Sequence, residues 1–205
     1  MAEPMSGYKA GYMPCPPTAE GSFMSSALTK SALAASFCRL LAERPFCKIT
    51  VADIAGGCGL SRMTFYYHFQ DVYDLLTWTC GERASAACEG LEWQEGLLRL
   101  FRTVRRDRDL VMNVYRSVDR SVLEAALFPF AHDLILREMG ARVGAGVTAP
   151  ADREFVVAFF EYAFAGTLLT WIGNGMGEDP REIVDRLGVI MSGQSVLLAD
   201  RFHAS

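Results

Sequence analysis

The chain has 205 residues, enough for one domain of ordinary size or for a small domain joined to a larger one. Its apolar fraction of 51%, with 13 Phe, 9 Met and 3 Trp, predicts more buried surface than one monomer needs, and thus a dimer interface or a ligand cavity. The net charge of −4 argues against a protein that holds nucleic acid by bulk charge, but it is compatible with a small local basic patch.

The N-terminal segment, residues 1–24, is rich in proline and glycine and has no apolar periodicity, so we expect a disordered arm. It lacks the basic start and continuous apolar run of a signal peptide, and we expect a cytoplasmic protein. The six cysteines form neither a CxxC pair nor a ligand spacing with His. This pattern favours reduced thiols, with redox sensing as the alternative, and predicts no metal and no cofactor.

The first helix is expected over residues 26–43, and a proline two residues later ends it. Its inward stripe follows the 3.6-residue period of an amphipathic helix. The stripe consists of Leu33, Phe37, Leu40 and Leu41.

Residues 50–76 have the spacing of a helix-turn-helix. Thr50, followed three residues later by Asp53, forms a capping box that starts a short helix. Gly59 can take the left-handed conformation that a tight turn requires, and Ser61 is a good N-cap for the next short helix. In DNA-reading proteins the second of two such helices enters the major groove, and an ordinary helical hairpin is the alternative.

A fourth helix is expected from about Asp71, which can cap it, to about Ala87. It joins the head (residues 25–80, the helix-turn-helix domain) to the body (residues 81–205). The body shows helical spacing and none of the two-residue alternation of strands. Its expected helices cover residues 92–106, 109–117, 120–139, 152–174 and a last segment that opens at Asp179-Pro180, with a loop at 140–147. The predicted fold class is therefore all-α.

Residues 155–172 are apolar apart from Glu161, so a membrane-spanning helix has to be considered. A spanning helix needs about 20 apolar residues, and a central carboxylate costs about 2.5–3.5 kcal/mol on insertion scales. No basic flank follows the segment. We therefore expect a helix buried by protein, and no membrane partner.

The helix-turn-helix also carries a series of specific residue types. They are Thr50-Val51, Ile54-Ala55, Cys58-Gly59, Leu60-Ser61, Thr64-Phe65-Tyr66, His68-Phe69 and Asp74-Leu75-Leu76. Over residues 28–80 this series resembles the TetR family of bacterial transcription regulators, and in particular a branch related to dihydroxyacetone kinase regulators. The resemblance implies a dimeric, sequence-specific DNA-binding repressor, or alternatively an activator, controlled by a small molecule or a partner protein.

The resemblance puts the base-reading surface on residues 61–68. Phe65 and Phe69, four residues apart, are expected to face the head core. Arg62 suits a guanine edge, with a phosphate contact as the alternative, and Thr64 suits a base or a thymine methyl. The residues expected to contact DNA are Lys48, Thr50, Ser61, Arg62, Met63, Thr64, Tyr66, Tyr67 and His68.

One position departs from the family pattern. Many members carry a Lys at the start of the fourth helix, where this chain has Val72. Because that cation adds a phosphate contact, its loss predicts a shallow salt dependence of DNA binding.

The body gives fewer signals. An aromatic and Met stripe at helical spacing is either plain core or the lining of an effector pocket, and it comprises Met112, Tyr115, Phe128, Phe159, Tyr162 and Trp171. In the TetR family the final helices of two subunits form a four-helix bundle, which implies a dimer. The alternative for the last helix is a core helix of a monomer. The expected dimer interface comprises Phe160, Phe164, Ile183, Leu187, Ile190, Gln194 and Leu197.

The leading hypothesis is a regulator that binds a double-stranded DNA operator as a homodimer. The alternative is a transcriptional co-activator or a protein-interaction module whose main partner is another protein, because the head carries few cations in excess of its acidic residues. An enzyme is not expected, since the chain lacks paired carboxylates at metal spacing, a nucleophile elbow and a phosphate loop.

Overall fold

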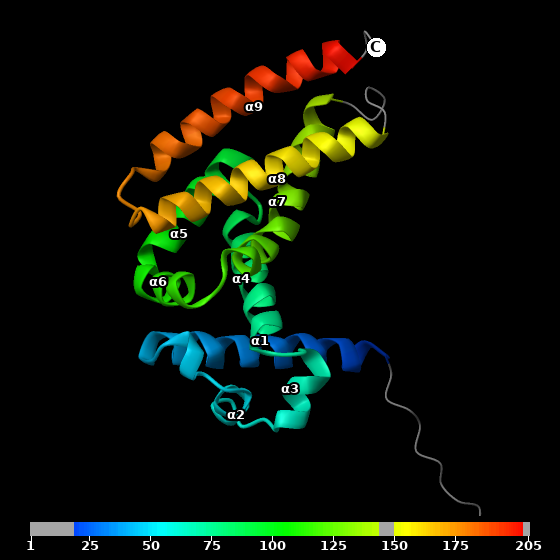
Figure 1. The fold of residues 1–205 in the computed structure, drawn as a ribbon. Helices are drawn as coiled ribbons and strands as arrows, with labels where there is room; N and C mark the ends of the chain where they lie inside the picture. Colours follow the sequence, from blue (N-terminus) through cyan, green and yellow to red (C-terminus); the bar gives the residue numbers. More distant parts are fainter. Residues whose placement is uncertain (1–18, 144–149, 203–205) are drawn as a thin grey trace, which may run out of the picture.

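The computed structural model describes residues 19–143 and 150–202, and in that part of the chain every regular element is a helix (Figure 1). α2 and α3 lie beneath α1, α4 rises from this layer, and α8 and α9 lie at the opposite end. The elements are α1 (Ala19–Glu43), the 3-10 helix η1 (Phe46–Lys48), α2 (Val51–Gly56), α3 (Arg62–His68), α4 (Val72–Cys88), α5 (Trp93–Arg106), α6 (Arg108–Ser117), α7 (Arg120–Val143), α8 (Pro150–Gly173) and α9 (Pro180–Phe202).

The predicted all-α class is confirmed, with two differences at element ends. α1 begins at Ala19, so the last residues of the segment expected to be a disordered arm are helical, while residues 1–18 lie outside the described part. α7 continues to Val143 and so includes half of the expected loop at 140–147; the other half lies outside the described residues. The glycines of that segment suggested a break, but an alanine, an arginine and a valine lie between them.

The head is close-packed around the predicted stripe of α1. Five side chains from α1 to α4 have no exposed surface at all: Leu33, Phe37, Ile54, Phe65 and Leu75. Burying a side chain of this size stabilises a fold by about 1.5–3 kcal/mol. The head core therefore fixes how α2 and α3 are presented.

α1 also holds the C-terminal end of α2 through polar contacts. The buried hydroxyl of Ser36 donates to the Ile54 carbonyl at 2.8 Å, and the Arg39 guanidinium donates to the Gly57 carbonyl at 2.7 Å. A Cβ at Gly57 would lie 2.4 Å from the Ser36 hydroxyl oxygen, so glycine permits this close approach. These contacts satisfy carbonyls that the end of α2 would otherwise leave free.

α8 is the one helix among the described residues that is long and apolar enough, by length and composition, to cross a membrane. Its buried side chains, among them Leu168, Leu169 and Ile172, pack in the body core. Glu161, the one charged residue of its apolar stretch 155–172, has a carboxylate oxygen 2.5 Å from Nδ1 of His132 on α7. These contacts are those of a helix packed against protein.

Candidate nucleic-acid interface

The turn between α2 and α3 has the geometry that its residues predict. The Thr50 side chain accepts from the Asp53 amide while the Asp53 side chain accepts from the Thr50 amide, which confirms the capping box. Gly59 lies in the left-handed region with φ +72°. The Ser61 hydroxyl accepts from the Thr64 amide at 3.1 Å and so caps α3. The residues that begin and end each helix thus set the angle at which α3 leaves the turn.

α3 presents one exposed face and one buried face. Phe65 and Phe69 are buried at 0% and 3% exposure, as expected. Met63 and Tyr67 are about four-fifths exposed, at 80% and 81%. Arg62 and Tyr66 are also exposed, while Thr64 and His68 are half-buried. A short helix with an anchored aromatic pair beneath and these groups above is suited to enter a DNA groove.

Lys30 of α1 lies near the rim of this surface. Its ammonium group is 5.6 Å from the centre of the Phe69 ring and 5.9 Å from that of Trp78. Burial, with a further contribution from the Lys30 charge, lowers the pKa of His68. The charged form of the His68 imidazole is therefore disfavoured at this position.

The second group of expected DNA contacts lies where η1 leads into α2. Lys48 and Thr50 are both exposed, on either side of the buried Ile49. The Thr50 hydroxyl is 2.7 Å from Asp53 Oδ2, and the bonds from Thr50 are the main cause that lowers the pKa of Asp53. A phosphate at Thr50 has to share that hydroxyl with the Asp53 carboxylate, which leaves Lys48 as the stronger contact.

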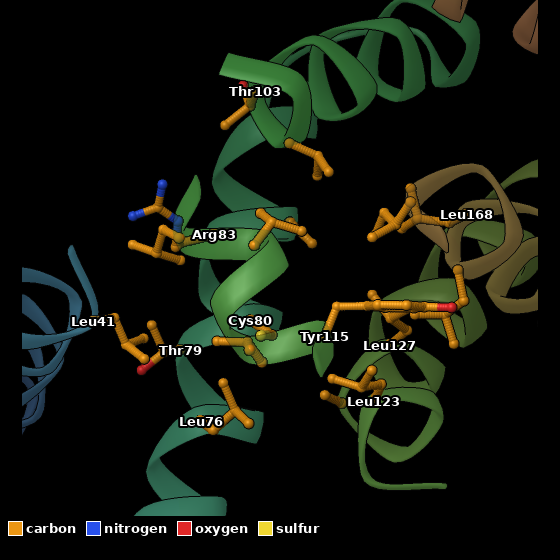
Figure 2. Close-up of a pocket in the computed structure, with 18 of the residues that line it drawn as sticks. Leu41, Leu76, Thr79, Cys80, Arg83, Thr103, Tyr115, Leu123, Leu127 and Leu168 are labelled. Atoms are coloured by element: carbon orange, nitrogen blue, oxygen red, sulfur yellow. The ribbon is translucent and has the colours of Figure 1, made fainter. Parts of the chain in front are cut away.

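A cavity of about 140 Å³ lies in the body, next to the junction with the head. Figure 2 shows labelled lining residues from α4, α6, α7 and α8 around it, with Leu41 of α1 on the side of the head. The walls are almost wholly apolar, and we call this space the body cavity. Its lining includes Phe37, Cys38, Leu41, Leu76, Thr79, Cys80, Arg83, Leu100, Val111, Val114, Tyr115, Leu123, Ala126, Leu127, Leu168 and Ile172.

Two of the polar groups at the body cavity, Thr79 and Arg83, are already engaged. The Thr79 hydroxyl donates to the Leu75 carbonyl at 2.7 Å. The Arg83 guanidinium pairs with Asp107 and also lies 3.9 Å from Cys38 Sγ. Burial raises the pKa of Cys80 to about 11, so this thiol is protonated at neutral pH.

Of the six residues expected at an effector pocket, only Tyr115 lines the body cavity. Phe159 and Tyr162 are exposed at 60% and 62%, on the outer face of α8. The other three pack elsewhere: Phe128 against the Tyr162 ring, Trp171 against Phe101, and Met112 as a partly buried neighbour of the core. The spacing of aromatic and Met residues in the body did not indicate that α1 and α4 form walls of this cavity, although Leu76, Thr79 and Arg83 of α4 recur at helical intervals.

The residues expected at the dimer interface differ in how far they are buried within the chain itself. Phe164 and Ile183 are buried in the core of the chain itself, at 6% and 4% exposure, because α8 and α9 turn these faces toward α5 and α7. Phe160 and Leu187 are partly buried, Ile190 is exposed, and the side chains of Gln194 and Leu197 lie outside the described set. On the described parts of α8 and α9, the large apolar side chains that remain exposed are Phe155, Phe159, Tyr162, Val189 and Ile190.

Two family models match the chain, over separate ranges of residues. The model of bacterial regulatory proteins of the tetR family matches residues 33–77, which covers most of the head. The model described as a transcriptional regulator C-terminal region matches residues 92–193, which covers most of the body. The chain belongs to the TetR family, and it is a DNA-binding transcription regulator of that type. Among curated proteins none matches the sequence.

Solved structures agree on the fold. The dihydroxyacetone kinase operon activator DhaS is 17% identical with a TM-score of 0.57, over 83% of this chain and 98% of its own. RolR in complex with resorcinol is 20% identical with a TM-score of 0.50, over 87% and 96%.

Proposed function

We propose that the chain binds a double-stranded operator as a homodimer and reads bases with the exposed face of α3. The supporting observation is that Arg62, Met63, Tyr66 and Tyr67 are exposed together above the buried Phe65. Arg62 offers a fork that matches the guanine edge, and the two tyrosine hydroxyls offer donors to phosphate oxygens. Ser61, Thr64 and His68 complete the contact surface.

The number of free cations predicts how the affinity depends on salt. Lys48 and Arg62 are the exposed cations of the proposed surface, and Val72 stands where many relatives carry a Lys. Even if both cations of each head contacted phosphates, a dimer would make four such contacts, so the log–log slope is expected to be no steeper than about −3.6. Titration of operator DNA at several salt concentrations tests this, and a slope near −8 would contradict the assignment.

We propose that the dimer forms through the outer faces of α8 and α9. Phe155, Phe159 and Tyr162 follow one another on α8 at helical spacing and are 71%, 60% and 62% exposed. Large apolar side chains exposed side by side mark an interaction site in a soluble protein. α9 adds Val189 and Ile190 to this surface. Sedimentation at micromolar concentration is expected to give a dimer.

We propose that the body cavity is the effector site, and that the effector is small, uncharged and mostly apolar. The volume of about 140 Å³ is close to that of an apolar cavity of about 150 Å³ that takes up benzene. A charged ligand would find no unpaired ion at these walls, because Arg83 already pairs with Asp107. A thermal-shift screen of single-ring aromatics and short alcohols is expected to find binders, and carboxylates of the same size are expected to fail.

We propose that the protein represses transcription from the promoter it binds, and that it acts in the cytoplasm. The alternative is activation with a partner protein as the effector, and the match to an operon activator is a reason to test it. A reporter gene placed behind the selected operator separates the two. Expression falls with added regulator in the first case and rises in the second.

A further inference from the structure

Asn113 of α6 makes three hydrogen bonds to the backbone of the head. Its Nδ2 donates to the Leu41 carbonyl at 2.7 Å and to the Arg44 carbonyl at 2.8 Å. Its Oδ1 accepts from the Phe46 amide at 3.0 Å. One side chain of the body therefore binds both sides of the bend where α1 ends and η1 begins.

These backbone groups need a partner from outside the head. The Leu41 carbonyl is in the last turn of α1 and has no partner within the helix, and the Arg44 carbonyl lies in the linker after it. Pro45, the residue after Arg44, has no amide hydrogen to donate to the Leu41 carbonyl. The amide of Asn113 supplies two donors and one acceptor in the positions required, which only an Asn or Gln side chain can do at once.

The clamped bend leads directly to the phosphate side of the proposed interface. Phe46 begins η1, Lys48 ends it, and the Ile49 amide donates back to the Phe46 carbonyl at 2.9 Å. Thr50 then caps α2. With this short path, a shift of the Phe46 backbone moves Lys48 and the first turn of α2.

We infer that Asn113 is a positioning residue for DNA binding: it holds η1 so that Lys48 can reach a phosphate. It does not touch DNA itself and acts through the Phe46 backbone. The inference rests on the proposed operator binding. It also gives α6 two roles, because the neighbours Val111 and Val114 line the body cavity while Asn113 holds the head.

The first test needs no DNA. Hydrogen exchange at the Phe46 amide is expected to accelerate in Asn113→Ala, because its acceptor is gone. Asn113→Asp keeps an acceptor for the Phe46 amide, but its second carboxylate oxygen replaces the group that donates to the Leu41 and Arg44 carbonyls. Because oxygen faces oxygen there, exchange at Phe46 is expected to accelerate in this variant as well. Trp171→Phe is the control, since it removes a hydrogen bond to the Glu178 carbonyl in which the head takes no part. An unchanged Phe46 rate in both Asn113 variants would overturn the inference.

The second test uses an operator selected from random duplexes by the wild-type protein. Asn113→Ala is expected to bind it about tenfold more weakly, the effect of one charged contact misplaced. The log–log salt slope is expected to shrink by up to about 2, since a dimer loses one phosphate contact at each Lys48. Trp171→Phe is expected to lower the unfolding temperature and leave the slope of the folded protein unchanged.

A double-mutant cycle decides whether Asn113 acts through Lys48. In a Lys48→Ala background, Asn113→Ala is expected to cause little further loss of affinity. Fully additive losses, or an unchanged salt slope, would overturn the positioning role while leaving the proposed function intact. Failure of the wild-type protein to select any operator would overturn both.

Discussion

The head and the body differ in how their functional surfaces arise. The α3 face depends on groups close in sequence: Ser61 caps the helix, and Phe65 and Phe69 anchor it from below. The body cavity is bounded by six helices, α1 and α4 to α8, so residues far apart in the sequence form its walls. We therefore expect the α3 face to tolerate few substitutions within its own segment. We expect the body cavity to accept a larger side chain without loss of the fold.

That contrast predicts the largest effect on stability in the head. Phe65→Ala is expected to lower the free energy of unfolding by about 3–5 kcal/mol, because a fully buried aromatic leaves a cavity in a close-packed core. Tyr66→Ala, at the exposed neighbouring position, is expected to change it by no more than about 0.5 kcal/mol. Urea titrations of both variants provide the measurement, and equal losses would contradict the assignment of inner and outer faces.

The next effect concerns the outer face of the body. Phe159→Glu is expected to convert the dimer to a monomer and to weaken operator binding roughly 100-fold, because two linked heads bind with a high effective concentration. Sedimentation and DNA titration measure the two effects. Leu28→Glu places the same charge at an exposed site on α1 and is expected to leave the dimer intact. A dimeric Phe159→Glu protein would refute the proposed interface.

A smaller effect is expected from filling the body cavity. Ala126 lies in its wall and is 2% exposed, so Ala126→Leu is expected to occupy the space at a cost below about 1.5 kcal/mol. The variant is expected to bind operator normally and to lose its response to the effector. Ala125→Leu, on the exposed side of the same turn, is the control and keeps that response. If Ala126→Leu still responds, the effector binds elsewhere.

The smallest effect distinguishes two cysteines. Burial raises the pKa of Cys80 from its ordinary value of 9.0 to about 11, so iodoacetamide at pH 8 is expected to label the exposed Cys47 well before Cys80. The protonated thiol stabilises the fold fully below about pH 9, and that stabilisation is lost as pH rises through about 11. Wild type is therefore expected to lose more stability than Cys80→Ala over this range. Equal rates of labelling would contradict the burial of Cys80.

The same contrast explains what could be read from the sequence. Caps, a glycine turn and an i, i+4 aromatic pair act over four residues, so the boundaries of α2 and α3 and the inward turn of Phe65 were predictable. Periodicity also located the helices of the body. Periodicity does not show whether an apolar face packs within the chain or against a partner subunit. Phe164 and Ile183 were therefore assigned to the dimer interface, although they lie in the core of the chain.

The clamp at Asn113 illustrates the same limit. Its partners lie 67 to 72 residues away in the sequence, and a single half-buried amide on an amphipathic helix carries no local sign of them. Only the packing of α6 against the end of α1 brings the groups together.

The most direct test of the account is operator selection from genomic fragments by purified protein, repeated with the Arg62→Ala, Tyr66→Ala double variant. Both side chains are exposed, so the variant is expected to fold and dimerise normally. We expect the wild-type protein to enrich a palindromic site, and we expect the double variant not to retain it. Equal retention of that site by the folded double variant would contradict base reading by α3.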